Sequence, residues 1–178
     1  MTATIHSMPN RQRGVVLAVS LILLLVLTLL GVTAMQSTVL QERMAGNARE
    51  ISMAFQAAEA ALRDGENALI ALTIRPTPCA TAPCGVWQRG VLGDPATQTA
   101  AWWTTNAQEY GVDATQEITQ GVDADPRFII EELGFVPDSL TLGHGIPVGR
   151  TYYRTAAHGV SASQTSRSVV ESTFVRRF

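Results

Sequence analysis

Lysine is missing from this sequence of 178 residues, because all thirteen basic residues are arginines. A chain without lysine side chains cannot use them as a nucleophile or to form a Schiff base with a substrate, so those classes of enzyme are excluded. Charged residues of either sign are also scarce, at 16% of the chain, where a soluble domain averages about 25%. The scarcity is greatest near the N-terminus, where residues 14–41 carry no charge.

Basic charge is in deficit over the rest of the chain. Without its first fourteen residues the sequence has 11 arginines and 15 acidic residues, which gives a net charge of −4. Nucleic-acid binding needs a concentrated basic surface that neutralises phosphates. We therefore expect no nucleic-acid partner.

Residues that could act as catalytic bases are few. His6 lies in the N-terminal segment, which leaves His144 and His158. Neither lies near a nucleophile motif or a partner at metal-ligand spacing. The acidic residues of the C-terminal half lack the D-x-D-x-D-G spacing of a calcium loop and favour a solvated acidic face: Asp123, Asp125, Glu131, Glu132 and Asp138. We expect a structural protein and no enzyme, cofactor or metal site.

The chain has only two cysteines, Cys79 and Cys84, in the segment CATAPC. In an exported domain a disulfide that closes this short ring is the default expectation. It removes about 2 kcal/mol of loop entropy from the unfolded chain, so it orders a loop and does not hold the fold together. A zinc site is less favoured, because zinc normally takes four ligands and no histidine is near in sequence.

An uncharged apolar run, Val15–Met35, is long enough to cross a membrane. At about 1.5 Å per residue its helix spans the roughly 30 Å hydrocarbon core. Arg11 and Arg13 precede it, and the next basic residue is Arg43. The positive-inside rule therefore places the N-terminus in the cytoplasm and the remainder outside.

The alternative interpretation of this run is a cleaved signal peptide. Its apolar part would be shorter, about 7–15 residues, and Gly31 with Ala34 makes a poor cleavage site. The helical pattern also continues after the run, with apolar residues at spacings of three, four and seven: Met44, Ala48, Ile51, Phe55, Ala58, Leu62, Leu69 and Leu72. Charged residues lie between them, on faces expected to be exposed: Arg49, Glu50, Glu59, Arg63, Asp64 and Glu66. We predict one continuous helix whose packing face includes Met44, Ile51, Phe55 and Leu62.

The segment RQRGVVLAVSLILLLVLTLLGVTAMQSTVLQERMAGNARE, followed by AFQAAEAALRDGE, carries a resemblance to a known family. It is similar to the N-terminal region of PilX-type minor pilins of type IV pili, over about residues 11–66. Gln41–Asn47 and Ala54–Arg63 carry most of this resemblance, and the C-terminal RSVVESTFVRRF adds a weaker one. The resemblance implies cleavage after Gly14 by the prepilin peptidase, N-methylation of the new terminus Val15, and insertion into a pilus from the inner membrane.

Two positions depart from the usual pilin pattern. Val15 stands where most mature pilins begin with Phe, which should matter little because cleavage depends chiefly on the glycine. Val19 stands at the fifth mature position, where major pilins carry a Glu that neutralises the terminal ammonium of a neighbour. An isolated charge in the apolar filament core costs several kcal/mol or more. Val19 cannot neutralise it, so the resemblance implies a place at the filament tip.

The remaining sequence completes an expected α+β fold. Thr73–Thr99 is rich in Pro, Gly and Thr and predicts an ordered loop region. Ala100–Tyr110 predicts a short helix, with Trp102 and Trp103 as core or loop anchors. Strands are expected at Phe128–Ile130, Thr151–Ser161 and Arg167–Phe178. The pilin-like architecture that results is a long N-terminal helix packed on a small antiparallel sheet.

These observations divide the chain into a leader (residues 1–14), a membrane and filament-core helix (15–40), its amphipathic continuation (41–72) and a periplasmic or extracellular domain (73–178). The expected function is that of a minor pilin at or near the pilus tip, which helps to initiate assembly. Its expected partners are other minor pilins, the major pilin, the prepilin peptidase and a tip adhesin. The alternatives are a minor pseudopilin of type II secretion and a signal-anchored periplasmic protein.

Overall fold

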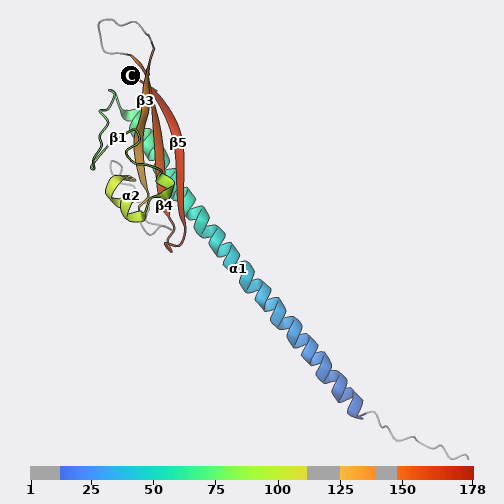
Figure 1. Cartoon of the computed structure of the whole chain (residues 1–178). Helices are drawn as coiled ribbons and strands as arrows, with labels where there is room; N and C mark the ends of the chain where they lie inside the picture. Colours follow the sequence, from blue (N-terminus) through green and yellow to red (C-terminus); the bar gives the residue numbers. More distant parts are fainter. Residues whose placement is uncertain (1–12, 112–124, 139–147) are drawn as a thin grey trace, which may run out of the picture. The chain divides into compact units, whose positions relative to one another are not determined.

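The computed structural model of the protein describes residues 13–111, 125–138 and 148–178. The chain divides into two compact units, Met1–Gly46 and Asn47–Phe178. A single helix, α1 (Arg13–Ala71), belongs to both units (Figure 1). The predicted continuous helix is therefore confirmed.

Within the first unit, the described residues form the N-terminal part of α1. Its hydrophobic side chains are exposed, and the helix is long and apolar enough to cross a membrane. The hydroxyl groups of the apolar run donate hydrogen bonds to carbonyl oxygens three residues earlier: Ser20 to Leu17 (2.9 Å), Thr28 to Leu25 (2.8 Å) and Thr33 to Leu30 (3.0 Å). Because lipid offers no hydrogen-bond partners, these internal bonds suit a helix in hydrocarbon.

The second unit combines the end of α1 with a small sheet. The elements that follow α1 are β1 (Trp87–Gln88), η1 (Pro95–Thr97), α2 (Ala100–Asn106), β2 (Gln108–Glu109), β3 (Arg127–Pro137), β4 (Gly149–Val160) and β5 (Arg167–Arg177). The strand order is β1-β3-β4-β5, and β2 also pairs with β3. All of these pairs are antiparallel except β1 with β3. The predicted fold is confirmed, with this parallel pair as an addition.

The three long strands are those that the sequence predicts, because they are rich in branched and aromatic residues. The ends of β4 and β5 differ by at most two residues from the predicted Thr151–Ser161 and Arg167–Phe178. β3 is longer than the predicted Phe128–Ile130, since it continues through two glutamates. A register shift between Glu132 and Gly134 marks a β-bulge in this continuation.

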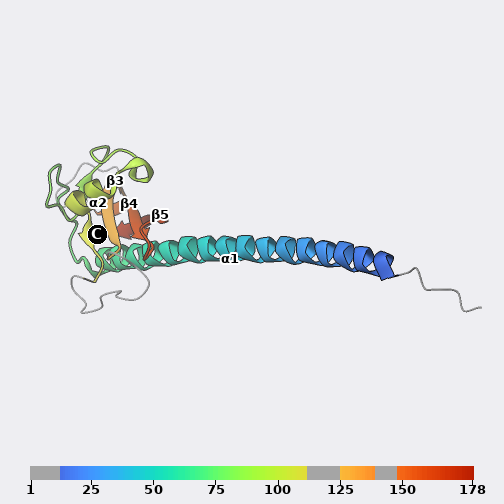
Figure 2. The same ribbon diagram turned by 90° about the horizontal axis from the view of Figure 1, so that it is seen from below.

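The sheet lies between the end of α1 and α2 (Figure 2). A hydrophobic cluster packs on each of its faces, one that includes residues of α1 and one that includes Trp103 of α2. The cluster towards α1 consists of Ala61, Leu62, Leu69, Val86, Phe128, Ile130, Tyr153 and Ala157. The cluster towards α2 consists of Cys84, Trp87, Leu92, Trp103, Ile129 and Ala156. Neighbouring residues of one strand alternate between the clusters, as the pleat requires. The first part of β3 and the last part of β4 are thus covered on both faces.

Small residues allow α1 to lie very close to β4. A Cβ added at Gly159 would meet the carbonyl oxygen of Ala54 and lie 2.5 Å from the backbone nitrogen of Ala58. On the helix, a Cβ added at Gly65 would lie 2.8 Å from Cγ2 of Thr155. Larger side chains do not fit here unless the helix moves, so these residues set the distance between helix and sheet.

The segment between α1 and α2 is ordered by a disulfide and by local hydrogen bonds. Cys79 and Cys84 form the predicted disulfide, with Cα atoms 5.9 Å apart. The backbone N–H of Cys79 donates to the carbonyl oxygen of Val86 at 3.0 Å, which holds the ring beside β1. Thr99 caps α2, because its side chain accepts a hydrogen bond from the backbone N–H of Trp102.

Candidate functional site

The predicted processing junction lies at the start of α1. Gly14 and Val15 belong to the first turn of the helix and are exposed. Val19 is 50% exposed on the same helix. Most of the leader falls outside the described residues. Cleavage after Gly14, methylation of Val15 and the significance of Val19 stay predictions.

The predicted packing face of α1 is correct at only one of its four positions. Leu62 is buried in the cluster towards α1, with 7% of its surface exposed. Met44, Ile51 and Phe55 are exposed, at 68%, 60% and 48%, so their assignment to the packing face was wrong. The residues that α1 does bury in the second unit are mostly small: Ala54, Ala57, Ala58, Ala61, Leu62, Gly65 and Leu69.

The physical reason is the short distance between helix and sheet. The contact at Gly159 admits only small side chains, so alanines and not Phe55 occupy it. Ile51 precedes Ala54, the first buried residue of α1, and therefore lies where the sheet no longer covers the helix. The apolar pattern continues beyond the core. We define Ile51 and Phe55, which both belong to the second unit, as the helix stripe.

Three carboxylates of α1 hold the helix to the rest of the second unit. They accept hydrogen bonds from groups far away in sequence: Glu50 from Oγ of Ser163 (2.5 Å), Asp64 from the backbone N–H of Gly111 (3.0 Å) and Glu66 from Oγ of Ser172 (2.6 Å). The bond from Ser163 is the main cause that lowers the pKa of Glu50. The sequence predicts these acids on the more exposed faces of the helix, and the structure adds that all three are partly exposed and hydrogen-bonded to distant residues.

Two neighbouring glutamates of β3 are buried and form ion pairs on opposite faces of the sheet. Glu131, only 2% exposed, pairs with Arg154 and accepts a hydrogen bond from the backbone N–H of Gly90 at 2.5 Å. Glu132 pairs with Arg75 at 2.6 Å. A solvated acidic face was the wrong expectation for this pair. Each carboxylate is buried because an arginine compensates its charge, without which burial would cost several kcal/mol.

Trp103 and His158 form a stacked pair in the cluster towards α2. Their ring centroids lie 5.1 Å apart, the planes differ by 17°, and the residues are 1% and 6% exposed. Trp102 packs edge-on against Trp103, which is the core anchor that was predicted. Burial lowers the pKa of His158, and the charge of Arg167 lowers it further. His144 falls outside the described residues.

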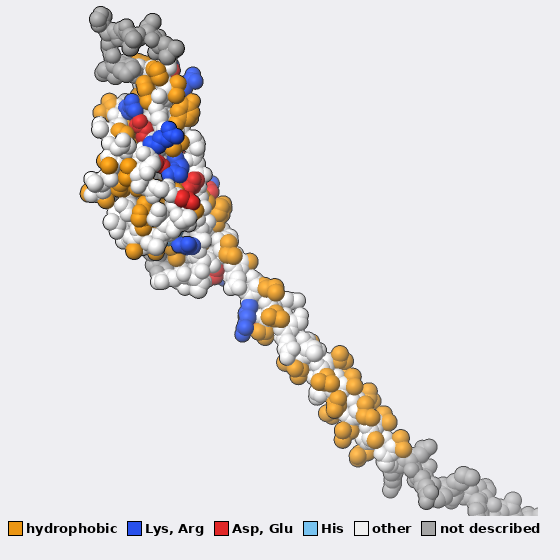
Figure 3. Space-filling view, in the orientation of Figure 1, with side chains coloured by type: hydrophobic (Ala, Val, Ile, Leu, Met, Phe, Trp, Pro, Cys, Tyr) orange, Lys and Arg blue, Asp and Glu red, His pale blue; other side chains and the backbone are white. Residues whose placement is uncertain are grey.

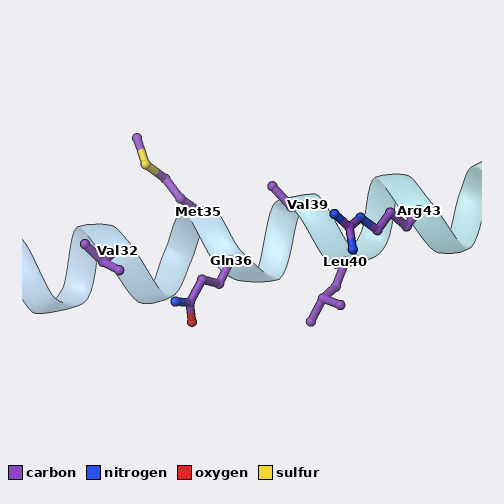
Figure 4. A pocket seen from close by; sticks show the side chains of 6 residues that line it. All are labelled: Val32, Met35, Gln36, Val39, Leu40 and Arg43. Atoms are coloured by element: carbon purple, nitrogen blue, oxygen red, sulfur yellow. The ribbon is translucent and has the colours of Figure 1, made fainter.

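Two hollows among the described residues are lined mainly by apolar side chains. The first lies on a single stretch of α1, and its side chains, including those of Met35 and Leu40, point in different directions (Figure 4). The second, of about 260 Å³, lies between the end of α1 and the disulfide loop and is lined by residues such as Leu72, Val86 and Ile130. In the described part of the chain, no group of three or more His, Cys, Asp or Glu residues is placed to hold a metal. These surfaces favour packing against apolar groups.

The family comparison agrees with an apolar helix that continues into a small sheet domain. The family model described as PilX N-terminal matches residues 13–63, and the one described as Type IV pilus assembly protein PilX C-term matches residues 70–176. No curated protein and no solved structure matches the chain. The apolar helix fits a membrane-anchored pilin, and the family implies interaction with other pilus components. The chain therefore belongs to the PilX family of type IV pilus assembly proteins, and it is a minor pilin.

Proposed function

We propose that this minor pilin occupies a place at or near the pilus tip, where it helps to initiate assembly and presents a partner such as an adhesin. The observation that carries the proposal is Val19. In the filament core, the terminal ammonium of a neighbouring subunit requires a nearby carboxylate, because an unpaired charge in an apolar medium is costly. A valine cannot meet this requirement, so the subunit suits a position that caps the bundle.

The proposal includes maturation at the start of α1. The prepilin peptidase cleaves after Gly14, and Val15 becomes the methylated terminus. Before assembly the apolar part of α1 spans the inner membrane, with Arg11 and Arg13 in the cytoplasm and the second unit in the periplasm. This orientation brings the globular unit to the pilus surface after assembly.

The helix stripe is proposed to contact other pilins. Large apolar side chains at helical spacing are normally covered, and Ile51 and Phe55 are uncovered by the second unit itself. Other minor pilins and the major pilin present similar apolar helices in a filament. Packing between such helices would remove the stripe from water.

Immunogold labelling tests the position in the pilus. An epitope inserted between Ala80 and Thr81 lies in the exposed disulfide ring. We expect few copies and label at one end of the filament, and deletion of the gene should sharply reduce pilus number while the major pilin stays in the membrane. Label spread evenly along the shaft would contradict the tip position. Val19→Glu should give no gain in assembly, because a capping subunit has no ammonium to neutralise.

N-terminal sequencing tests the maturation step. The membrane protein should begin at Val15, and Gly14→Glu should leave the leader in place, because a bulky charged side chain does not fit the cleavage site. A mature terminus near Met35 would instead identify an ordinary signal peptide.

A further inference from the structure

Arginines gather at the end of the sheet where α1 terminates. Arg150 lies in register with Arg177 of β5, and Arg176 precedes it on that strand. Arg176 donates a hydrogen bond to the carbonyl oxygen of Leu72, just after the last turn of α1, and Arg75 follows in the same segment. We define Arg75, Arg150, Arg176 and Arg177 as the basic end.

The charge of this end is opposite to that of the chain. Within the described residues, the acids of the basic end are Glu132, paired with Arg75, and Asp138, paired with Arg177 at 2.8 Å. Counting side chains alone, these four arginines and two acids sum to +2, whereas the side chains after residue 14 sum to −4. Positive charge is therefore concentrated here against the balance of the molecule.

Arg150 and Arg177 are placed in a way that does not stabilise the free subunit. They are Cα partners in the antiparallel ladder, so their side chains leave the same face of the sheet. Like charges directly opposite each other destabilise a strand pair. Asp138 compensates Arg177, while Arg150 is exposed and forms no ion pair within the described ranges. A carboxylate supplied from outside would complete this arrangement.

Exposed apolar side chains accompany these arginines. Val136 lies opposite Arg150 and is 53% exposed, and Val148 and Ile74 are 52% and 76% exposed. Figure 3 shows basic and hydrophobic side chains together near the end of the sheet that carries the C-terminus. Arginine beside apolar surface is typical of protein interfaces, whereas a polysaccharide or another polyanion requires only the charge.

We propose that the basic end is the docking surface for an acidic, partly apolar segment of another protein at the pilus tip. The proposal rests on the proposed tip function and specifies the chemistry of the partner. A carboxylate of the partner lies between Arg150 and Arg177, and apolar side chains of the same segment cover Val136. Charge complementarity then selects the partner, because an acidic surface is attracted and a basic one is repelled.

Site-specific photo-crosslinking in piliated cells tests this surface. The full-length chain carries benzoylphenylalanine in place of Val136, and the adduct is identified by mass spectrometry. We expect one protein adduct, with Asp or Glu in the cross-linked segment. Arg150→Glu should lower its yield by about tenfold or more, and the matched control Arg63→Glu, which reverses an exposed arginine on α1, should leave it unchanged.

A charge exchange provides the second part of the test. Replacing the partner's cross-linked acid with Arg should restore the adduct in the Arg150→Glu background. Thermal melts should show that Arg150→Glu does not lower Tm, since it removes a like-charge pair. Absence of a protein adduct, an adduct on polysaccharide only, or a yield independent of Arg150 would overturn the docking proposal.

Gold labelling of the same strains separates the two proposals. Label at the filament end together with a yield independent of Arg150 refutes the docking surface alone. Label spread along the shaft refutes the tip function, whatever the cross-link yield.

Discussion

Replacing Gly159 with alanine tests how closely α1 lies on the sheet. The added Cβ would meet the carbonyl oxygen of Ala54 and lie 2.5 Å from the backbone nitrogen of Ala58 and 3.0 Å from Cβ of Ala57. Two of these three atoms belong to the helix backbone, which cannot rotate away as a side chain can. Overpacking a core costs about 1–3 kcal/mol, and we expect about 3 kcal/mol here because the helix itself has to move.

Thermal and urea unfolding of a soluble fragment beginning at Gln41 measure this cost. For a domain of this size, about 1 kcal/mol corresponds to a change in Tm of roughly 3–5 °C, so Gly159→Ala should lower Tm by about 10–15 °C. Gly134→Ala is the matched control on β3, since no described atom lies within 4 Å of its added Cβ. It should change the free energy of unfolding by less than about 0.5 kcal/mol.

A third variant tests whether the side chain of Ala57 or the backbone of α1 obstructs the new Cβ. Of the three atoms nearest to the new Cβ at Gly159, only Cβ of Ala57 belongs to a side chain, and Ala57→Gly removes it. It should not rescue Gly159→Ala, because the backbone obstruction at Ala54 and Ala58 remains. If Gly159→Ala and its control melt within about 2 °C of each other, the backbone of α1 does not lie this close to Gly159 of β4. That result would refute the predicted loss of stability.

Three further predictions concern the packing face, the buried ion pair and pH. Leu62→Ala should cost about 2–5 kcal/mol in urea unfolding, whereas the exposed Phe55→Ala should cost less than about 1 kcal/mol but reduce pilus number; equal losses of stability would contradict the observed face. Glu131→Gln should cost about 3 kcal/mol, because Arg154 loses its counter-charge, and an unchanged Tm would show that the pair is solvated. Burial holds the pKa of His158 below 6.5, so the unfolded chain binds more protons and stability falls as pH decreases from 6.5 towards the folded pKa. His158→Phe should reduce that slope in melts between about pH 4.5 and 6.5, and an unchanged slope would assign it to other groups.

Features that depend on composition and short spacing could be predicted without tertiary structure. An uncharged run such as Val15–Met35 has few alternatives to a membrane helix. Cys79 and Cys84 have no other cysteine to pair with, and the branched and aromatic residues of β4 and β5 favour strands in any context. The continuous helix followed from an apolar pattern that stayed in phase beyond the membrane segment.

The spacing of apolar residues does not contain the information that decides which face of α1 is buried. Hydrophobicity ranks Phe55 above alanine as a core residue, but the distance between α1 and β4 leaves room only for small side chains. That distance is set jointly by Gly159 on the sheet and by alanines on the helix, which are about a hundred residues apart in sequence. Only the folded arrangement shows that the second unit leaves Ile51 and Phe55 exposed.

Some properties of the charged residues follow from the sequence, and others follow only from the fold. The sequence by itself determined that this chain has no lysine, an excess of acids and an uncharged segment at residues 14–41, because these are properties of composition. Only the tertiary structure decided that Glu131 and Glu132 are buried beside arginines and that Arg150 faces Arg177. The reason is that electrostatic energy depends on separation and on exposure to water, and both are set by contacts between residues distant in the chain.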